Sequence, residues 1–181
     1  MSKMNSFYTE KELAELGLKK YGTNVLISRK CSIYSPNKIS IGDNVRIDDF
    51  CILSGNITIG SHIHIAAYCA LFGSMGIEMH DYSGLSSRVT IYSAMDDFSG
   101  DYLTGPNQKE GTTNVQGGLV LVKRYTIIGT NTTVFPNITI HEGAVIGAHS
   151  LVNRDVKEWS VNVGWPVRYL NDRKKGLLNL I

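Results

Sequence analysis

The chain has 181 residues, a size typical of one domain, and 43% of them are hydrophobic, which is enough to build a core. Its formal net charge of +2 is too small to indicate a surface for nucleic acid. No apolar run approaches the roughly 18 residues that cross a bilayer, and the N-terminus lacks the apolar segment of a secretion signal. We therefore expect a cytoplasmic protein with neither a nucleic-acid nor a membrane partner.

Residues 1–24 are expected to form an N-terminal helical cap. A helix over 9–20 is predicted because Thr9 is a typical N-cap residue and Glu12 follows it three positions later, as in a capping box. We expect this helix to cover one end of the core that follows and to protect its open edge.

Residues 25–163 carry an aliphatic residue at every sixth position, except within one long interruption. A helix repeats near 3.6 residues and a half-buried strand near 2, so neither element explains a period of six. Such a period is typical of a parallel β-helix, in which short strands wind into stacked coils. The two unbroken series are Ile41, Ile47, Leu53, Ile59, Ile65 and Leu71, and then Val122, Ile128, Val134, Ile140, Ile146 and Val152.

The positions between these aliphatic residues predict a triangular coil. Gly or Asp often comes directly after the aliphatic residue, as at Gly42 and Gly60, and we expect this position at a corner where a Cβ is costly. The fifth position of the repeat is small or β-branched and should point inward. Cys31, Cys51 and Cys69 all occupy it, so we interpret them as small core thiols rather than as redox or metal-binding groups.

The phase of the repeat slips by two residues at two places. One slip lies between Ile33 and Ile41, and the other lies between Leu71 and Met79. Each predicts a bulged corner, because Pro, Asn, Ser and Gly gather there.

Residues 94–118 interrupt the repeat, and this inserted loop is longer than the roughly 12–15 residues usual in a compact domain. Loops of this length are usually functional or disordered. The loop opens with an acidic pair, Asp96 and Asp97. After the repeat ends, residues 164–181 are expected to form a C-terminal helix or basic tail.

The repeats, the loop after IYSAMDD, the stretch VFPNITIHEGAVIGAHSLVNRDV and the closing VGWPVRYL resemble the hexapeptide-repeat acyltransferases. The resemblance implies an all-β, left-handed parallel β-helix that assembles as a homotrimer. It also implies an acyl-CoA co-substrate, here acetyl-CoA, and active sites between neighbouring subunits near the inserted loop.

Within that family the chain is most similar to sugar acetyltransferases. The maltose and galactoside O-acetyltransferases place a catalytic His where this chain has Asp96. The run IYSAMDDFSG looks more like the group that acetylates amino groups of nucleotide-linked deoxysugars such as dTDP-4-amino-4,6-dideoxyglucose. Those sugars feed the synthesis of bacterial lipopolysaccharide O-antigen and capsule.

The chemistry of acetyl transfer favours an amine acceptor for this chain. A sugar hydroxyl is a very weak acid that needs a base such as His, whereas a carboxylate with an ordinary pKa of about 3.9 is a poor base for it. A neutral amine is already a good nucleophile, and a carboxylate need only hold its ammonium form or accept a late proton. We therefore predict that Asp96 and Asp97 are catalytic; the alternative is that they bind backbone amides and shape the loop.

His80 is the third candidate catalytic residue. It lies 17 residues before Asp97, close to one coil of three hexads, so the hypothesis places it beside the acidic pair as a base or orienting partner. The alternative is a surface His at a corner. The five His show no repeated ligand spacing, and we expect no metal site.

Binding residues follow from the resemblance. Glycine and alanine after the loop would let the pantetheine arm approach the backbone, and the Asn-Arg pair that follows stands where relatives carry Thr-Lys. Guanidinium groups near the C-terminus would meet the CoA phosphates, and residues of the loop would meet the sugar. The predicted cofactor-binding residues are Gly129, Gly147, Ala148, Asn153, Arg154, Arg168 and Arg173, and the predicted substrate-binding residues are Ser93, Phe98 and Tyr102.

The function expected from these features is acetyl-CoA-dependent N-acetylation of a nucleotide-linked amino-deoxysugar. A sugar O-acetyltransferase of the maltose or galactoside kind is the first alternative. A non-enzymatic β-helix that binds or scaffolds is the second.

Overall fold

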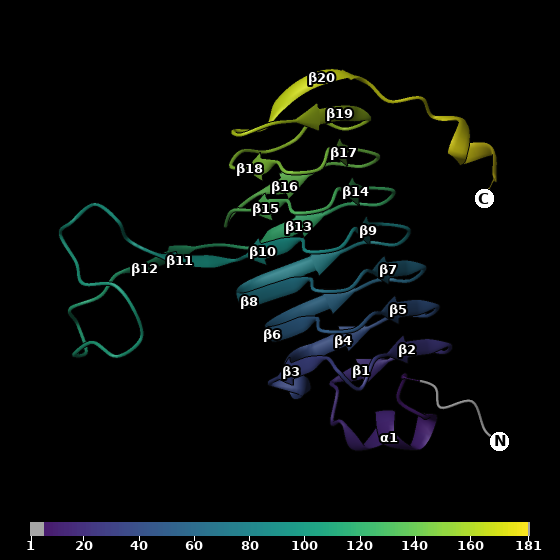
Figure 1. The fold of residues 1–181 in the computed structure, drawn as a ribbon, viewed down its shortest axis with the longest axis horizontal. Coiled ribbons are helices and arrows are strands. Elements are labelled where there is room, and N and C mark those ends of the chain that lie inside the picture. The colour runs from purple at the N-terminus through teal and green to yellow at the C-terminus, as the bar shows by residue number, and fades with distance from the viewer. Residues whose placement is uncertain (1–5, 181) are drawn as a thin grey trace.

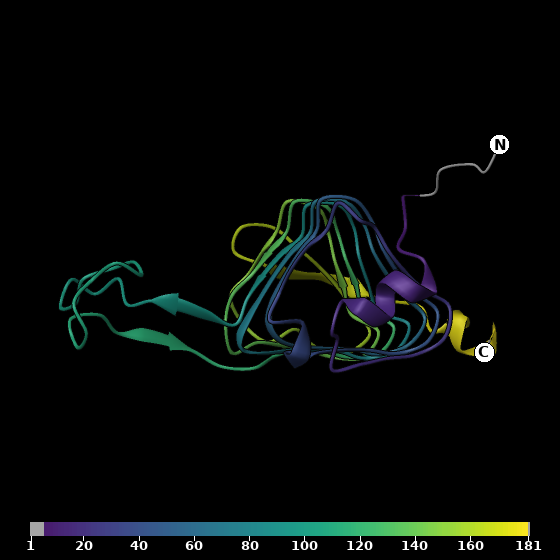
Figure 2. The same ribbon diagram turned by 90° about the horizontal axis from the view of Figure 1, so that it is seen from below.

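Parallel strands wind around one axis and stack into a β-helix with a triangular outline (Figures 1 and 2). The structure is a computed structural model and describes residues 6–180. The predicted all-β parallel β-helix is confirmed. Every aliphatic residue of the two predicted series is at most 2% exposed.

Ten strands form one continuous sheet that covers two faces of the triangle, because β6 and β8 run around the corner between them. We call these the first and second faces. The first face ends in β18 and the second in β16. The ten strands are β1 Lys20–Tyr21, β3 Ser32–Tyr34, β4 Ile39–Ile41, β6 Ile52–Ile59, β8 Ala70–Met79, β10 Thr90–Tyr92, β13 Val120–Val122, β15 Thr133–Val134, β16 Thr139–Ile140 and β18 Leu151–Val152.

The third face is a separate eight-stranded sheet, and its strands stack in chain order. All of its pairs are parallel except the last, in which β20 returns antiparallel along β19. The strands are β2 Val25–Ile27, β5 Val45–Ile47, β7 Ile63–Ile65, β9 Gly84–Leu85, β14 Ile127–Ile128, β17 Val145–Ile146, β19 Ser160–Val163 and β20 Arg168–Asp172.

Three columns of aliphatic side chains fill the interior, one behind each face. On the first face Leu53 pairs with Leu71, Leu71 with Ile91, and Ile91 with Val134. Each of these residues is fully buried. Burying one such side chain stabilises a fold by about 1.5–3 kcal/mol, so the columns are the main source of stability.

The three corners of the coil differ in their residues, and we name each of them by a characteristic feature. The arm corner joins the first and second faces at Ser93, the histidine corner joins the second and third at His80, and the small-residue corner joins the third and first at Ser86. Backbone hydrogen bonds from one coil to the next stack each of the last two. The histidine corner contains Gly42, Gly60, His80, Lys123 and His141, and the small-residue corner contains Asp48, Ala66, Ser86, Gly129 and Gly147.

Corner glycines are needed for stacking rather than for an unusual backbone angle. A Cβ on Gly129 would lie 2.6 Å from the backbone nitrogen of Ala148, and a Cβ on Gly42 would lie 2.7 Å from the carbonyl of Gly60. The left-handed backbone occurs two positions later, at non-glycine residues such as Asn131. The prediction that a Cβ is costly at the corner therefore holds, but the clash is with the next coil.

Both phase slips are visible in the strand register. Ile33 pairs with a residue 20 positions later, whereas Ile41 pairs with one 18 positions later. The two extra residues are accommodated at a short 3-10 turn, η1 Pro36–Lys38. At the second slip no separate bulged loop forms, because β8 continues through the corner and the register changes beside Gly55.

Different elements close the two ends. Helix α1, Glu10–Glu15, lies across the N-terminal end (Figure 2) and has the predicted Thr9–Glu12 capping box, but it is shorter than the expected 9–20. At the other end, residues 164–181 were expected to be a helix or tail. They instead contain strand β20 and the 3-10 turn η2, Gly176–Leu180. Within residues 6–180, no helix is long and apolar enough to cross a membrane.

Candidate active site

The inserted loop is an arm that projects from the arm corner (Figures 1 and 2). Its base is a two-stranded antiparallel ladder of β11, Ala94–Asp96, and β12, Val115–Gly117. These strands were not predicted, because the hydrophobic pattern ends where they begin. The ladder holds the start of the loop away from the helix, so the acidic pair lies on the arm.

Asp97 organises the arm. Its carboxylate accepts hydrogen bonds from the Ser99 backbone, the Asn114 amide and the Gln116 amide, each at 2.8 Å. The bonds from Ser99, together with the bond from Asn114, hold the pKa of Asp97 below its usual range. This carboxylate therefore has the loop-shaping role that the sequence left as an alternative.

Asp96 is bound much less. One of its carboxylate oxygens accepts a hydrogen bond from the Gly105 backbone at 3.0 Å, and no other hydrogen bond of that carboxylate occurs within residues 6–180. The side chain is half-buried at the end of β11. Of the two acids, Asp96 is the one with an oxygen left for a ligand.

Ser93 does not meet the expectation of a substrate-binding residue. It is fully buried, and its hydroxyl accepts from the Met75 backbone and donates to the Phe72 carbonyl. It therefore fixes the root of the arm to the coil below. Phe98 and Tyr102, the other predicted substrate residues, lie on the arm, where they are 73% and 44% exposed.

His80 lies at a different corner from the arm. Strand β13 crosses the second face from the returning arm at Gly118 to Val122, and the His80 backbone bonds to the Val122 carbonyl. The expected position of His80 beside Asp97 is therefore wrong within one chain. The reason is that the residues between them include the start of the arm, so their separation of 17 does not correspond to one coil.

The small-residue corner carries the predicted pantetheine residues Gly129, Gly147 and Ala148. Gly129 and Gly147 stack on consecutive coils, since each corner amide bonds to a carbonyl of the following coil. Ala148 is exposed beside them. Packing alone explains Gly129, whose Cβ would strike the backbone of Ala148, yet the same packing leaves a surface with few side chains.

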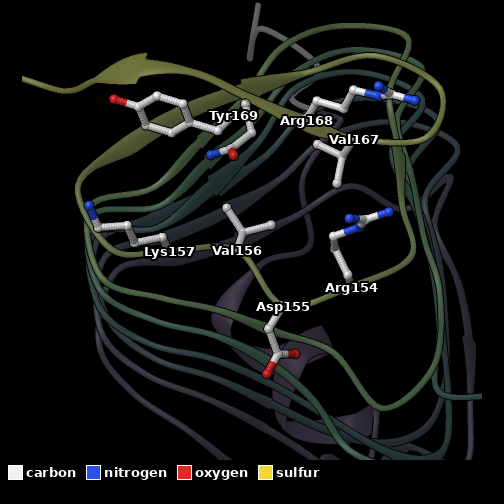
Figure 3. Close-up of a pocket in the computed structure, with 8 residues that line it drawn as sticks. Arg154, Asp155, Val156, Lys157, Val167, Arg168 and Tyr169 are labelled. Atoms are coloured by element: carbon white, nitrogen blue, oxygen red, sulfur yellow. The ribbon is translucent and has the colours of Figure 1, made fainter.

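A cavity of about 690 Å³ opens at the C-terminal end of the helix (Figure 3). Arg154 and Arg168, both predicted to bind the cofactor, lie on one side of it, and Lys157 and Tyr169 lie on the other. The carboxylate of Asp155 is engaged by the Thr139 backbone at 2.8 Å. The cavity therefore presents three cationic side chains and suits an anion such as a phosphate.

Two predicted cofactor residues lie elsewhere. Arg173 donates to the carbonyls of Tyr125 and Gly143 at 2.7 and 3.0 Å, and burial lowers its pKa. It braces the C-terminal segment against the histidine corner rather than facing the cavity of Arg168. Asn153 lines a separate cavity of about 330 Å³ at the root of the arm, with Met95 and Phe135 among its neighbours.

A polar cluster on the third face was not predicted from the sequence. His64 Nε2 lies 2.7 Å from a carboxylate oxygen of Asp48, and Arg46 Nε donates to the other oxygen at 2.7 Å. Burial opposes the ionisation of Asp48, but these two partners outweigh it and lower its pKa. His64 and Ser86 also line a cavity of about 370 Å³. The sequence feature that could have indicated this cluster is His64, which takes an outward position of the repeat just before a corner of small residues.

The candidate residues thus occupy three corners of one chain: the acidic pair on the arm, His80 at the histidine corner, and the glycines at the small-residue corner. A single chain does not bring them together. The described residues also contain no cluster of three or more His, Cys, Asp or Glu side chains that could hold a metal ion.

Comparison with known proteins identifies the family to which this fold and these residues correspond. Residues 38–73 match the model of the bacterial transferase hexapeptide, six repeats. The chain is 43% identical to dTDP-4-amino-4,6-dideoxy-D-glucose acyltransferase of Escherichia coli over 178 residues, which covers 97% of the chain and 93% of that protein.

Solved structures agree. The chain superposes with a TM-score of 0.95 and 51% identity on a serine-to-cysteine mutant of AntD, an N-acyltransferase from Bacillus cereus, in complex with dTDP-4-amino-4,6-dideoxyglucose and coenzyme A. The match covers 98% of this chain and 95% of that one. A maltose O-acetyltransferase from Clostridium difficile 630 matches with a TM-score of 0.56 and 21% identity, over 91% of this chain and 75% of that one, which shows the shared fold alone. The chain belongs to the hexapeptide-repeat acyltransferases.

Proposed function

We propose that the chain transfers an acyl group from a CoA thioester to the 4-amino group of dTDP-4-amino-4,6-dideoxyglucose or a close relative of that sugar. The relatives that match nearly the whole chain act on or bind this sugar nucleotide. Membership of an acyltransferase family excludes the non-enzymatic β-helix. The product would serve bacterial surface polysaccharides such as O-antigen or capsule.

The observation that carries the proposal is the partly free carboxylate of Asp96. In its ammonium form the sugar amine would hydrogen-bond to this carboxylate and lose one proton to it or to water. The neutral nitrogen then attacks the thioester carbonyl, the C–N bond forms and the C–S bond breaks. The second amine proton goes to the departing CoA thiolate, so the products are an amide and the free thiol.

A serine complements this role. AntD has been solved with substitutions of a serine and of an aspartate that lie ten positions apart. This chain has the same separation at Ser86 and Asp96, and again at Ser87 and Asp97. We favour the first pair, because both carboxylate oxygens of Asp97 are engaged by its own loop, whereas Asp96 accepts one hydrogen bond. The Ser86 hydroxyl would donate to the oxygen of the attacked carbonyl.

The distribution of candidate residues over three corners supports a homotrimer. A ring of subunits brings different surface patches of neighbouring chains into contact. The arm of one subunit would reach the small-residue corner of the next, and Asp96 would then face Ser86 of that neighbour. In this arrangement His80 would lie at the interface and orient a neighbouring group.

The donor would run along the small-residue corner. Gly129, Gly147 and Ala148 would face the pantetheine arm, and the cationic cavity of Arg154 and Arg168 would hold the phosphates. Acetyl-CoA remains our expected donor, although AntD has also been solved with dTDP and 3-hydroxybutyryl-CoA.

Release of free thiol from acetyl-CoA tests the proposal. The purified chain is supplied with dTDP-4-amino-4,6-dideoxyglucose, and in parallel with the analogue that carries a hydroxyl at the same carbon. We expect thiol release and a new amide only with the amine. Acylation of the hydroxyl analogue alone would instead support the O-acetyltransferase alternative.

A further inference from the structure

One outward position of the third face carries a glycine in the middle of a sheet. Gly84 of β9 pairs with His64 on one side and with Ile127 on the other. Glycine in a strand weakens it, because it loses more conformational freedom on folding and has no side chain to pack. The other outward residues of this part of the column all have side chains: Arg46, His64, Ile127 and Val145.

The fold does not require this glycine. Its backbone is not in the left-handed region, and an added Cβ would be 3.5 Å from both the His64 carbonyl oxygen and the Ile127 Cδ1 atom. These are ordinary van der Waals contacts. Gly129, in contrast, would place a Cβ 2.6 Å from a backbone nitrogen. An alanine fits at position 84, so packing within the protein does not explain why this residue is a glycine.

The missing side chain leaves space in the cavity of about 370 Å³ on this face. Strand β9, which carries Gly84, lies between β7 and β14 (Figure 1). The cavity reaches the small-residue corner at Ser86, whose amide bonds to the Ile128 carbonyl of the next coil. Gly129 follows Ile128, so the cavity lies one coil from the start of the proposed pantetheine surface. Its lining consists of His64, Ala66, Gly84, Leu85, Ser86, Ser87 and Ile127.

We propose that Gly84 sets the size of the acyl group that the enzyme accepts, by leaving room for a donor chain longer than acetyl. This inference rests on the proposed function, because it takes the thioester to lie near Ser86. Ile127 and Ala66 offer apolar contact to the acyl chain of the donor. The hydroxyls of Ser86 and Ser87 and the imidazole of His64 offer hydrogen bonds, so the lining also accommodates a short acyl chain with a hydroxyl substituent, in addition to the expected acetyl group.

Competition between donors of different length tests the role of Gly84. The kcat/KM values for acetyl-, butyryl- and 3-hydroxybutyryl-CoA are measured with saturating amino sugar nucleotide. In the wild type we expect the longer donors to be used within about tenfold of acetyl-CoA. Gly84→Val should lower kcat/KM for the longer donors by about tenfold or more and for acetyl-CoA by less than about threefold, since one methylene in an apolar pocket changes kcat/KM by about 10–200-fold.

Three further variants make the result specific. Gly84→Ala should give a smaller change in the same direction, and it keeps the test valid if valine disturbs the fold. Ile127→Ala enlarges the cavity and should shift preference toward the longer donors. Val145→Ala removes the same kind of side chain one coil away and should leave the preference unchanged; thermal unfolding of each variant reports on folding.

Two results would overturn the inference in distinguishable ways. Equal donor preference in all the variants would remove Gly84 from the acyl site while leaving acyl transfer itself intact. Absence of thiol release from any donor in the wild type would remove the proposed function, and the role of Gly84 would fall with it.

Discussion

Asp96 and Asp97 are adjacent in sequence but differ in how much of each carboxylate is free. Asp97 accepts three hydrogen bonds from its own arm, whereas Asp96 accepts one. A carboxylate that already accepts three hydrogen bonds within the protein has little capacity left for a substrate ammonium group. The sequence could identify the acidic pair, but the distinction depends on Asn114 and Gln116, which the chain brings back about 17–19 positions later.

Substitution by asparagine should separate the two acids. Asp96→Asn is expected to lower kcat by about 100-fold without changing the unfolding temperature, because the lost carboxylate serves the amine. Asp97→Asn should instead make the arm more sensitive to proteolysis, since an asparagine NH2 group cannot accept the bonds that the carboxylate receives. Steady-state kinetics and limited proteolysis provide the two measurements, and unchanged kcat in Asp96→Asn would assign both acids to the loop.

The two C-terminal arginines give a second residue-level prediction. Arg168→Ala should raise the KM for the acyl-CoA by about tenfold with little change in kcat, since a hydrogen bond to a charged group is worth about 1.5–3 kcal/mol. Arg173→Ala is the matched control. It leaves two carbonyls unpaired and should lower stability by about 1–3 kcal/mol, while the KM of the folded enzyme stays the same. The reverse pattern would place the CoA phosphates at the histidine corner.

At the scale of elements, the aliphatic hexads predict the strands and their inward faces because burial acts on each position directly. The backbone conformation at the corners is harder to predict from the sequence. Left-handed backbone at corners costs a non-glycine residue about 1–2 kcal/mol, yet Phe50, Tyr68 and Arg88 adopt it. Their side chains stack from coil to coil, with Arg88 over Tyr68 and Phe50 against Tyr68. This stacking offsets the cost of the left-handed backbone. Because it joins residues some 20 positions apart, no local sequence pattern predicts it.

Helix α1 shows how one element depends on pH. Hydrogen bonds from Arg29, and then from the backbone and side chain of Thr9, lower the pKa of Glu12 from 4.5 to about 2. A lowered pKa in the folded state means that the ionised form stabilises the fold at pH values above the ordinary pKa. This contribution should be lost as the pH falls from about 4.5 toward 2.

The comparison of wild type with Glu12→Gln measures this contribution. Unfolding temperatures of both proteins are recorded from pH 6 to pH 2, so that the titration of all other carboxylates cancels in the difference. We expect the wild type to be the more stable at pH 6 and the difference to shrink as the pH falls below about 4.5. A difference that does not change with pH would mean that the Glu12–Arg29 pair adds nothing through its charge.

At the scale of the whole molecule, the repeat predicts a helix of coils but not which corners cooperate. The sequence predicted His80 to lie one coil from the acidic pair, whereas the structure places the acidic pair, His80 and Gly129 at three separate corners of a chain. Spacing in the sequence maps onto a coil only while the coil is uninterrupted, and the arm breaks that mapping. The burial of Ser93, a predicted substrate-binding residue, is not evident from the sequence because burial at the root of an arm depends on the coil beneath it.

Subunit mixing tests whether the corners of neighbouring chains form the site. One chain carries Asp96→Asn on the arm, and the other carries Ser86→Leu at the small-residue corner; each alone should be nearly inactive. After unfolding and refolding of an equal mixture, about a quarter of wild-type activity should return, because half of the arms and half of the corners are intact at random in a ring. Light scattering should show three chains of 20.0 kDa per particle. Inactive mixtures with that mass would mean that arm and corner act within one chain, since random assortment in a trimer otherwise guarantees intact pairs.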